Sequence, residues 1–214
     1  MKIILSLFCF ISSFILGAQI SSIGLGYNQT TFHFTAAEGL LSSELINSGG
    51  LTFDVLFQTK RESYYELGFL FRQYNAKGGN ALQSYSWKTN YIGPQIIFTK
   101  ENIFNKTSVS FGLGVLGMIS GKQTLGGQTL SLRKNSEFNG IWISPAAQLS
   151  YIVFDFTEAD IKLNYQFSPT FKMGDQGNEK LYFSSHSLGF MIYLKSIRED
   201  ILIHVFWMAI YQLS

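Results

Sequence analysis

Apolar and polar residues alternate along most of the chain beyond its N-terminal segment. In the segment 161–168 (IKLNYQFS), each odd position is apolar and each even position is polar. The segments 51–58 and 65–72 alternate in the same way, with Leu56 and Leu70 as the exceptions. Because successive side chains of a β-strand point to opposite faces, this period of two predicts strands with one apolar and one polar face.

The alternation divides the chain into eight predicted strands. They lie near residues 20–30, 50–59, 63–75, 83–99, 106–121, 138–154, 159–171 and 182–194. Each is longer than the ~5–6 residues usual for strands of globular proteins. Each is also long enough for the ~9–11 residues that a tilted strand needs to cross a bilayer.

The connections between these strands alternate in length. Short connections are expected near 60–62, 99–105 and 155–158, and longer ones near 36–50, 75–82, 121–137 and 172–181. Short turns at one end and long loops at the other are typical of outer-membrane barrels. The predicted fold class is therefore all-β, an antiparallel up-and-down transmembrane β-barrel of about eight strands over residues 19–195.

The polar face of the predicted strands supplies the candidate site. It carries six polar or ionisable residues, namely Asp54, Glu66, Arg72, Lys162, Asn164 and Gln166. Small residues share this face, among them Gly112, Gly114 and Ser144. An eight-stranded barrel has an interior just wide enough for side chains, and buried charges must be paired. We expect the six residues to form a network that plugs the lumen, and a polar pathway for a small solute is the alternative.

The first 18 residues, MKIILSLFCFISSFILGA, have the pattern of a secretory signal peptide. A short basic region at Lys2 precedes an apolar stretch, which ends in the small residues Gly17 and Ala18. A membrane anchor is the alternative, for which the apolar run is short. The single cysteine, Cys9, lies in this segment, so the mature chain from Gln19 would hold no disulfide. Export to the cell outer membrane is the localisation expected.

Composition supports strands and argues against several classes of function. Aromatic residues make up 16% of the chain and charged residues 14%, well below the ~25% charged residues of soluble domains. The net charge is +2 without a basic cluster in the sequence, which argues against a nucleic-acid partner. The histidines His33, His186 and His204 have no metal-ligand spacing. The segment 112–117 (GLGVLG) lacks the following helix of a dinucleotide site, and we expect neither metal nor cofactor.

The last predicted strand, 187–194 (SLGFMIYL), has the order of polar, glycine and apolar positions of an outer-membrane assembly signal. With this strand and the alternation before it, the chain resembles the small outer-membrane β-barrels of the OmpX/OmpA type, including PorT-like barrels. The resemblance implies contact with outer-membrane lipid and, through the loops, with other envelope or secretion proteins. In that family the last strand usually ends the chain, whereas here an apolar tail, 196–214, follows. The tail could be a strand, a docking segment or a helix, and we favour a short helix.

The predicted function is that of a non-enzymatic, monomeric outer-membrane protein with a plugged polar lumen and outward-facing loops for envelope interaction or assembly. One alternative is a lipid-modifying barrel enzyme, because His186 stands beside Ser184, Ser185 and Ser187. Adjacent strand residues face opposite sides, so His186 is not expected to activate Ser185 or Ser187. The other alternative is a soluble lipocalin-like ligand-binding barrel, in which the apolar face would point inward.

Overall fold

The computed structural model describes residues 19–35, 46–58, 65–79, 84–135, 138–174 and 180–195. Within these ranges the elements are β1 (Gln19–Thr35), β2 (Ile46–Gln58), β3 (Tyr65–Gly79), β4 (Ser84–Phe104), β5 (Thr107–Leu125), β6 (Gln128–Ser131), the 3-10 helix η1 (Leu132–Lys134), β7 (Ile141–Asp155), β8 (Ala159–Lys172) and β9 (Lys180–Leu194). The predicted signal peptide, 1–18, and the C-terminal tail, 196–214, lie outside the described residues.

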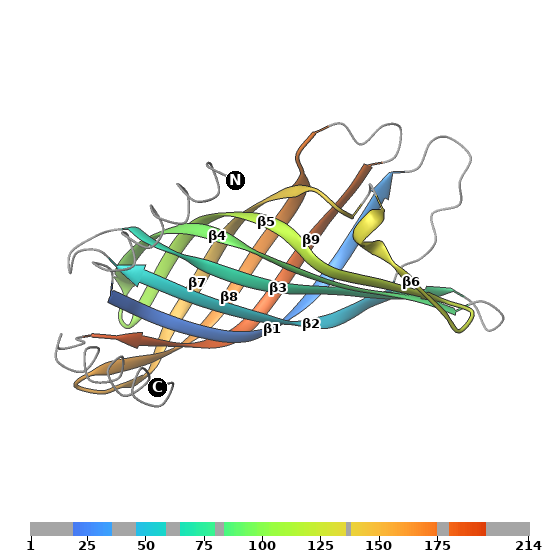
Figure 1. The fold of residues 1–214 in the computed structure, drawn as a ribbon. Helices are drawn as coiled ribbons and strands as arrows, with labels where there is room; N and C mark the ends of the chain where they lie inside the picture. Colours follow the sequence, from blue (N-terminus) through green and yellow to red (C-terminus); the bar gives the residue numbers. More distant parts are fainter. Residues whose placement is uncertain are drawn as a thin grey trace, which may run out of the picture.

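Eight strands close into an antiparallel barrel (Figure 1). The first and last strands, β1 and β9, pair with each other, and β4 pairs with β5 to complete the ring. The four-residue β6 pairs with β5 and extends beyond the ring. The all-β, eight-stranded barrel predicted from the alternation is confirmed.

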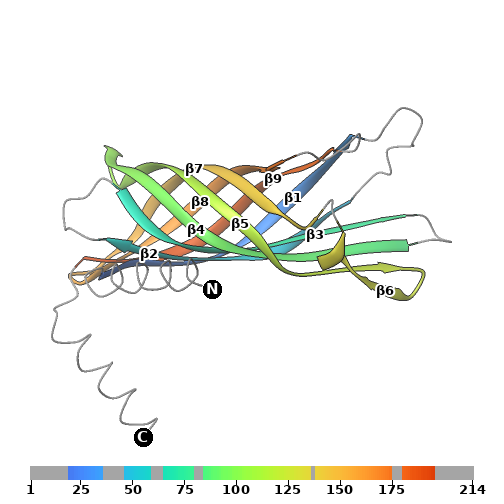
Figure 2. The same cartoon turned by 45° about the horizontal axis from the view of Figure 1, so that its top comes forward.

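The strands run obliquely to the barrel axis (Figure 2). Following paired residues once around the barrel from Thr107 leads back to β5 at Gly117, ten residues further along. Such a stagger requires tilted strands, typically by about 35–45°. The tilt explains why strands of 13 to 21 residues form this barrel.

The two ends of the barrel differ, as the connection lengths predict. At one end, here the turn end, Asn105 and Lys106 join β4 to β5, and residues 156–158 join β7 to β8. The opposite end, here the loop end, carries the β5–β6 hairpin and η1 (Figure 1). Gly126 and Gly127 make this hairpin turn with φ of 53° and 85°, a conformation that glycine adopts without strain.

Four predicted connections were wrong in extent. A loop was expected over 36–50, but β2 begins at Ile46, and another over 75–82, but β3 continues to Gly79. The other two connections lie beside β5. Residues 99–104 were assigned to a link, but β4 continues through them and only a two-residue turn follows. Residues 121–137 were expected to be a loop, but β5 continues to Leu125 and β6 and η1 follow. In both places the backbone of β5 supplies pairing partners that extend the ladder beyond the alternating segment.

Candidate functional site: the barrel interior

Strand parity separates the inside of the barrel from the outside. On β5, Ser108 and Ser110 are buried inward, whereas Phe111 on the same strand is 63% exposed on the outer face. The two exceptions to the sequence alternation are inward-pointing leucines, since Leu56 and Leu70 are both buried. The tip of Leu70 lies 2.6 Å from where a Cβ on Gly114 would sit, so this glycine makes room for it.

A polar layer fills the middle of the interior, formed by Asp54, Arg72, Gln95 and Gln166. The Arg72 guanidinium donates two hydrogen bonds to the Asp54 carboxylate, at 2.8 and 2.9 Å, and a third to Oε1 of Gln166 at 3.2 Å. The Gln95 amide donates to the same carboxylate at 2.9 Å. The Arg72 side chain is 4% exposed and that of Asp54 13%. Arg72 and Asp54 meet because the register makes them diagonal neighbours on β3 and β2.

The other predicted network residues form separate contacts nearer the turn end. The Lys162 ammonium lies 3.0 Å from the Glu101 carboxylate and 4.3 Å from the centroid of the Tyr193 ring. Glu66 accepts a hydrogen bond from the Ser21 hydroxyl. The structure therefore distributes the charged members of the predicted set over three contacts. Sequence reasoning missed Glu101 because it fell in the segment assigned to a link.

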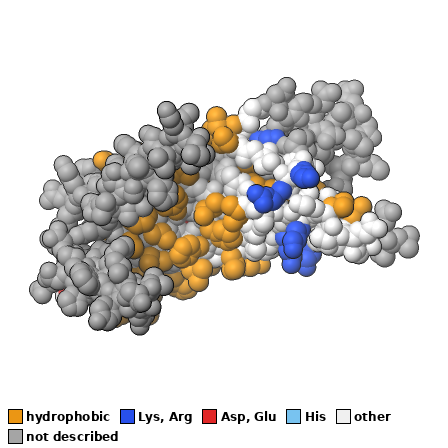
Figure 3. All heavy atoms as spheres, viewed as in Figure 1, with side chains coloured by type: hydrophobic (Ala, Val, Ile, Leu, Met, Phe, Trp, Pro, Cys, Tyr) orange, Lys and Arg blue, Asp and Glu red, His pale blue; other side chains and the backbone are white. Residues whose placement is uncertain are grey.

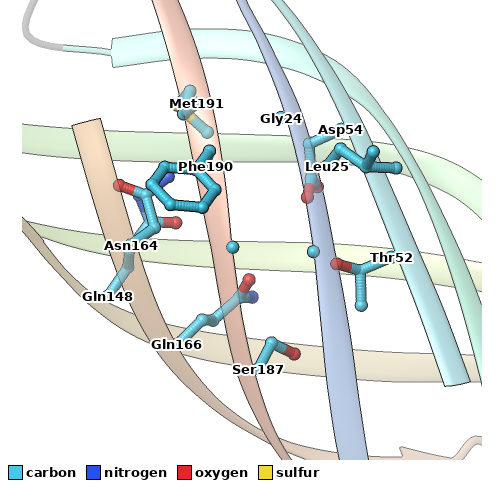
Figure 4. A pocket seen from close by; sticks show the side chains of 12 residues that line it. Gly24, Leu25, Thr52, Asp54, Gln148, Asn164, Gln166, Ser187, Phe190 and Met191 are labelled. Atoms are coloured by element: carbon cyan, nitrogen blue, oxygen red, sulfur yellow. The ribbon is translucent and has the colours of Figure 1, made fainter. Parts of the chain in front are cut away.

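Asn164, the remaining residue of the predicted set, borders a small cavity beside the polar layer (Figure 4). The cavity of about 20 Å³ lies against Gly24, Gly26 and Gly189 and is also lined by Asp54. Within the described residues, Oδ1 of Asn164 has no hydrogen-bond partner. A space of this size holds about one water molecule, so the described interior offers no room for a larger solute here.

An aromatic plug fills the interior toward the loop end, and the sequence analysis missed it. Its buried members are Phe32, Leu70, Tyr74, Ala76, Tyr91, Leu116, Leu132, Phe138, Trp142, Leu181 and Phe183. The Phe183 ring lies 4.6 Å from Trp142 and 4.7 Å from Tyr74, measured between ring centroids. Small residues and paired charges were expected throughout the lumen, and that expectation was wrong for this half. The signal was available, because Trp142 has the inward parity between Ile141 and Ile143.

Two residues that follow β6 close the top of the aromatic plug. Leu132 of η1 and Phe138 of the next connection are both buried against the strand residues. The Phe138 carbonyl accepts hydrogen bonds from Nε1 of Trp142 at 3.0 Å and from the Tyr91 hydroxyl at 3.1 Å. The ring of Phe138 packs edge-on against Trp87. The connection between β6 and β7 is therefore anchored inside the barrel mouth.

The serine and histidine motif is divided between the two faces of β9. Nδ1 of His186 lies 2.7 Å from the Tyr165 hydroxyl on the outer face. Ser185 is buried on the inner face and donates to the Ser168 carbonyl, and Ser187 is also buried. This arrangement places His186 away from both serines. Among the described residues, no group of three or more His, Cys, Asp or Glu side chains could hold a metal ion.

The outer face is apolar around the whole circumference. Exposed apolar side chains occur on every strand of the barrel, for example Leu25, Phe53, Phe69, Ile92, Phe111, Leu149, Tyr165 and Phe190. Figure 3 shows apolar side chains over one part of the visible face and lysine and arginine side chains nearer the loop end. Between these zones, Asn90 accepts from Gln73 at 3.1 Å and donates to Ser120 at 2.8 Å.

A charged cluster marks the turn end. The Lys195 ammonium binds the Asp155 carboxylate and lies 2.7 Å from that of Asp160. The hydrogen bond from Lys195, and then its charge, lower the pKa of Asp155. Hydrogen bonds to Asp155 and Asp160 in turn raise the pKa of Lys195.

Within the described part of the chain, no helix is long and apolar enough to cross a membrane.

An apolar exterior around a filled, closed, eight-stranded barrel is the architecture of small outer-membrane barrel proteins. The chain is similar to Neisserial surface protein A (NspA), with a TM-score of 0.51 and 15% identity over 84% of this chain and 99% of that one. It is also similar to Ail, the attachment invasion locus protein of Yersinia pestis, with a TM-score of 0.45 and 16% identity over 80% and 97% of the two chains. The outer membrane protease OmpT of Escherichia coli matches with a TM-score of 0.39 and 7% identity over 83% and 94%.

The similarity to NspA concerns the fold and leaves the role open. No protein-family model matches the chain, and no curated protein matches it. At 15% identity, the likeness to NspA shows a shared barrel fold.

Proposed function

We propose that this protein is an integral outer-membrane β-barrel without catalytic activity, whose interior is closed to solutes and whose loop end is a contact surface for other envelope components. The observation that carries the proposal is the apolar outer face around the full circumference. Leu25 and Phe111 are each 63% exposed, and Phe190 is 56% exposed. Soluble monomers avoid apolar surfaces of this extent, whereas lipid favours them and barrel closure satisfies the backbone hydrogen bonds.

Two fillings support the closed interior. The aromatic plug occupies the loop half, and the Arg72–Asp54 pair with Gln95 and Gln166 crosses the middle. The cavity beside them has a volume of about 20 Å³. Eight-stranded barrels have interiors that side chains can fill completely, so solute transport through the lumen is not part of the proposal.

The alternatives have less support from the geometry. A lipocalin-like carrier would have an apolar ligand cavity inside and a polar outer face, whereas the outer face here is apolar and the apolar interior is occupied by packed side chains. A lipid-modifying enzyme would need His186 within reach of a serine nucleophile, but His186 contacts Tyr165. Our proposal includes the export signal at 1–18, the barrel at 19–195, the separate tail at 196–214 and a PorT-like relationship, which rests on the alternation over 19–195 together with the pattern of the last strand.

The test is fractionation of cells that express the tagged chain, followed by a gel of boiled and unboiled detergent extracts. We expect an outer-membrane fraction whose mobility shifts on heating, because a closed barrel resists unfolding by detergent. Leu113→Arg should reduce the shifted band, since an arginine in the lipid-facing band costs about 2–4 kcal/mol. Leu130→Arg is the matched control, because Leu130 is 54% exposed on β6 against 46% for Leu113 on β5.

A soluble periplasmic fraction without a heat shift would contradict the membrane proposal. The closed interior is tested separately with liposomes that contain the purified barrel and an entrapped sugar. Sugar release no faster than from protein-free liposomes is the expected result. Rapid release would contradict a closed interior and favour the polar pathway instead.

A further inference from the structure

Five cations gather at the loop end, on the neighbouring strands β3, β4 and β5 and on η1, which follows β6. Lys88 on β4 pairs directly with Lys122 on β5, and Lys122 in turn pairs with Ser131 of β6. Lys77 on β3 is two residues from the partner of Lys88. We call Lys77, Lys88, Lys122, Arg133 and Lys134 the cation stripe. No basic cluster was visible in the sequence, because the strand register brings these residues together.

The cation stripe is exposed and has no neutralising partner within the described residues. All five side chains are exposed, and the described residues of the loop end include no Asp or Glu. The ion pairs of the described chain involve Arg72, Lys162 and Lys195 instead. Lys88 and Lys122 are directly opposite each other in the β4–β5 ladder. Like charges in this position destabilise a strand pair, so we expect a bound anion to relieve the repulsion.

The height of the stripe coincides with the edge of the apolar band. Ile92 on β4 is one of the exposed apolar residues of the outer face. The hydrogen-bonded pair of Asn90 and Ser120 follows it toward the loop end. Lys88 is two residues beyond Asn90, hence about 13 Å from Ile92 along the strand and less along the tilted barrel axis. Headgroups occupy roughly 5–8 Å on each side of the hydrocarbon core. Lysine stems can lie along apolar surface while the ammonium reaches polar groups.

We propose that the cation stripe binds the phosphate groups of anionic lipid headgroups in the leaflet that surrounds the loop end. The inference rests on the proposed membrane function. Lys88 and Lys122 of the stripe point outward from β4 and β5. Figure 3 shows the basic side chains beside the apolar zone, on its loop-end side. This position makes membrane lipid the neighbouring source of anions. The four lysines offer point charges, and Arg133 offers a planar fork that fits phosphate oxygens.

The experiment uses the full barrel in nanodiscs made of phosphatidylcholine alone or of equal parts phosphatidylcholine and diphosphorylated lipid A. Lipid that stays bound to the protein is identified by native mass spectrometry. Each basic residue near an anionic surface adds appreciable binding free energy, so Lys88→Gln/Lys122→Gln should retain roughly tenfold less lipid A than the wild type. The control is Lys100→Gln/Lys106→Gln, which removes two exposed lysines at the turn end and should behave like the wild type.

Stability against urea provides a second measurement, in which the effect of the double substitution should have opposite signs in the two lipid compositions. In phosphatidylcholine alone, Lys88→Gln/Lys122→Gln should unfold at the same or a higher urea concentration than the wild type, because repulsion is removed. In the lipid A mixture the same variant should unfold at a lower urea concentration. The heat-shift gel on each sample reports barrel insertion independently, so a failed barrel is distinguished from absent lipid binding.

Three outcomes would overturn the proposal. The first is a wild type with no preference for lipid A although its barrel is inserted. The second is an equal loss of lipid A in the turn-end control, which would indicate general charge attraction. The third is lysine-dependent binding of a soluble sulfated polysaccharide to the detergent-solubilised barrel without any lipid A preference, which would identify a soluble polyanion as the occupant.

Discussion

Two neighbouring regions of the barrel interior are filled by different kinds of side chain, aromatic rings in the loop half and charged and amide groups in the middle. In the loop half, the Phe183 ring contacts the rings of Tyr74 and Trp142, and each of the three side chains is at most 1% exposed. In the middle, the Arg72–Asp54 pair depends on charge-assisted hydrogen bonds. Truncating a packed ring lowers the free energy of unfolding in proportion to the volume removed. For a buried ion pair, the largest loss comes from a mutation that removes one partner and leaves the other charge buried alone. The same barrel thus combines two responses to mutation.

Trp142→Ala should have the largest effect. It removes a ring that is 0% exposed and a hydrogen bond to the Phe138 carbonyl. Truncation of a buried aromatic residue costs about 3–5 kcal/mol, and we expect the upper end of this range in the free energy of unfolding. Urea unfolding of the barrel in lipid vesicles measures it. Trp142→Phe is the control, and a loss as large for Trp142→Phe as for Trp142→Ala would contradict a volume effect.

Arg72→Met should follow, with a loss of about 3–4 kcal/mol, because it leaves the Asp54 carboxylate unpaired in the interior. Arg72→Met combined with Asp54→Asn should recover most of this loss, since the charge is removed with its partner. The double-mutant cycle uses the same urea unfolding. Equal losses for the single and the double variant would mean that the middle layer behaves like the aromatic plug, and the contrast between the halves would fail.

Glu101→Gln tests the ion pair of the buried Lys162, between the polar layer and the turn end, and should cost about 1 kcal/mol. Lys162 is buried with its side chain 6% exposed, but the Glu101 side chain is 52% exposed, so solvent screens the pair. Lys162 also keeps the Tyr193 ring. The neighbouring Lys100→Gln is the control and should change the unfolding free energy by less than about 0.5 kcal/mol. A cost as large as that of Arg72→Met would show that depth in the barrel does not set the strength of these pairs.

The cluster at the turn end should give the smallest effect, a weak pH dependence. The pKa of Asp155 is lowered by Lys195, so its contribution is present above the ordinary aspartate pKa and is lost as pH falls through the lowered value. The pKa of Lys195 is raised, so its contribution is lost as pH rises through that raised value. The unfolding midpoint should therefore be flat between these limits. Lys195→Gln should flatten both edges, and unchanged edges in this variant would assign the pH dependence to other groups.

Much of the fold was predictable because strand parity is a local property. The period of two identified all eight barrel strands. It also assigned the six polar residues of the candidate site to the inner face, where the structure has them. Parity also placed Trp142 inward, but the apolar side chains of the interior were not followed beyond Leu56 and Leu70. Those two exceptions pointed to apolar packing inside the barrel, since Leu70 belongs to the aromatic plug.

The contacts between strands could not be predicted in the same way. Glu101 meets Lys162 although 61 residues separate them, and Lys88 meets Lys122 through the register of β4 and β5. The first pair joins β4 to β8, which are not neighbours, and therefore depends on closure of the barrel, whereas the second depends on the register of two adjacent strands. Phe138 enters the barrel mouth from a connection without any period, and its burial depends on the space left by the surrounding rings.

The most direct test of the central claim, an apolar outer face in lipid around a filled interior, is nitroxide scanning along β5. Because the sequence beyond Cys9 has no cysteine, single cysteines can be placed at the outward Val109, Phe111, Leu113 and Val115 and at the inward Ser108 and Ser110. In lipid vesicles, the account predicts that labels at the outward sites collide with dissolved oxygen, which concentrates in lipid, and are shielded from a water-soluble nickel reagent. Inward labels should be shielded from both. Outward labels open to the nickel reagent would contradict the account, because that face would then be in water.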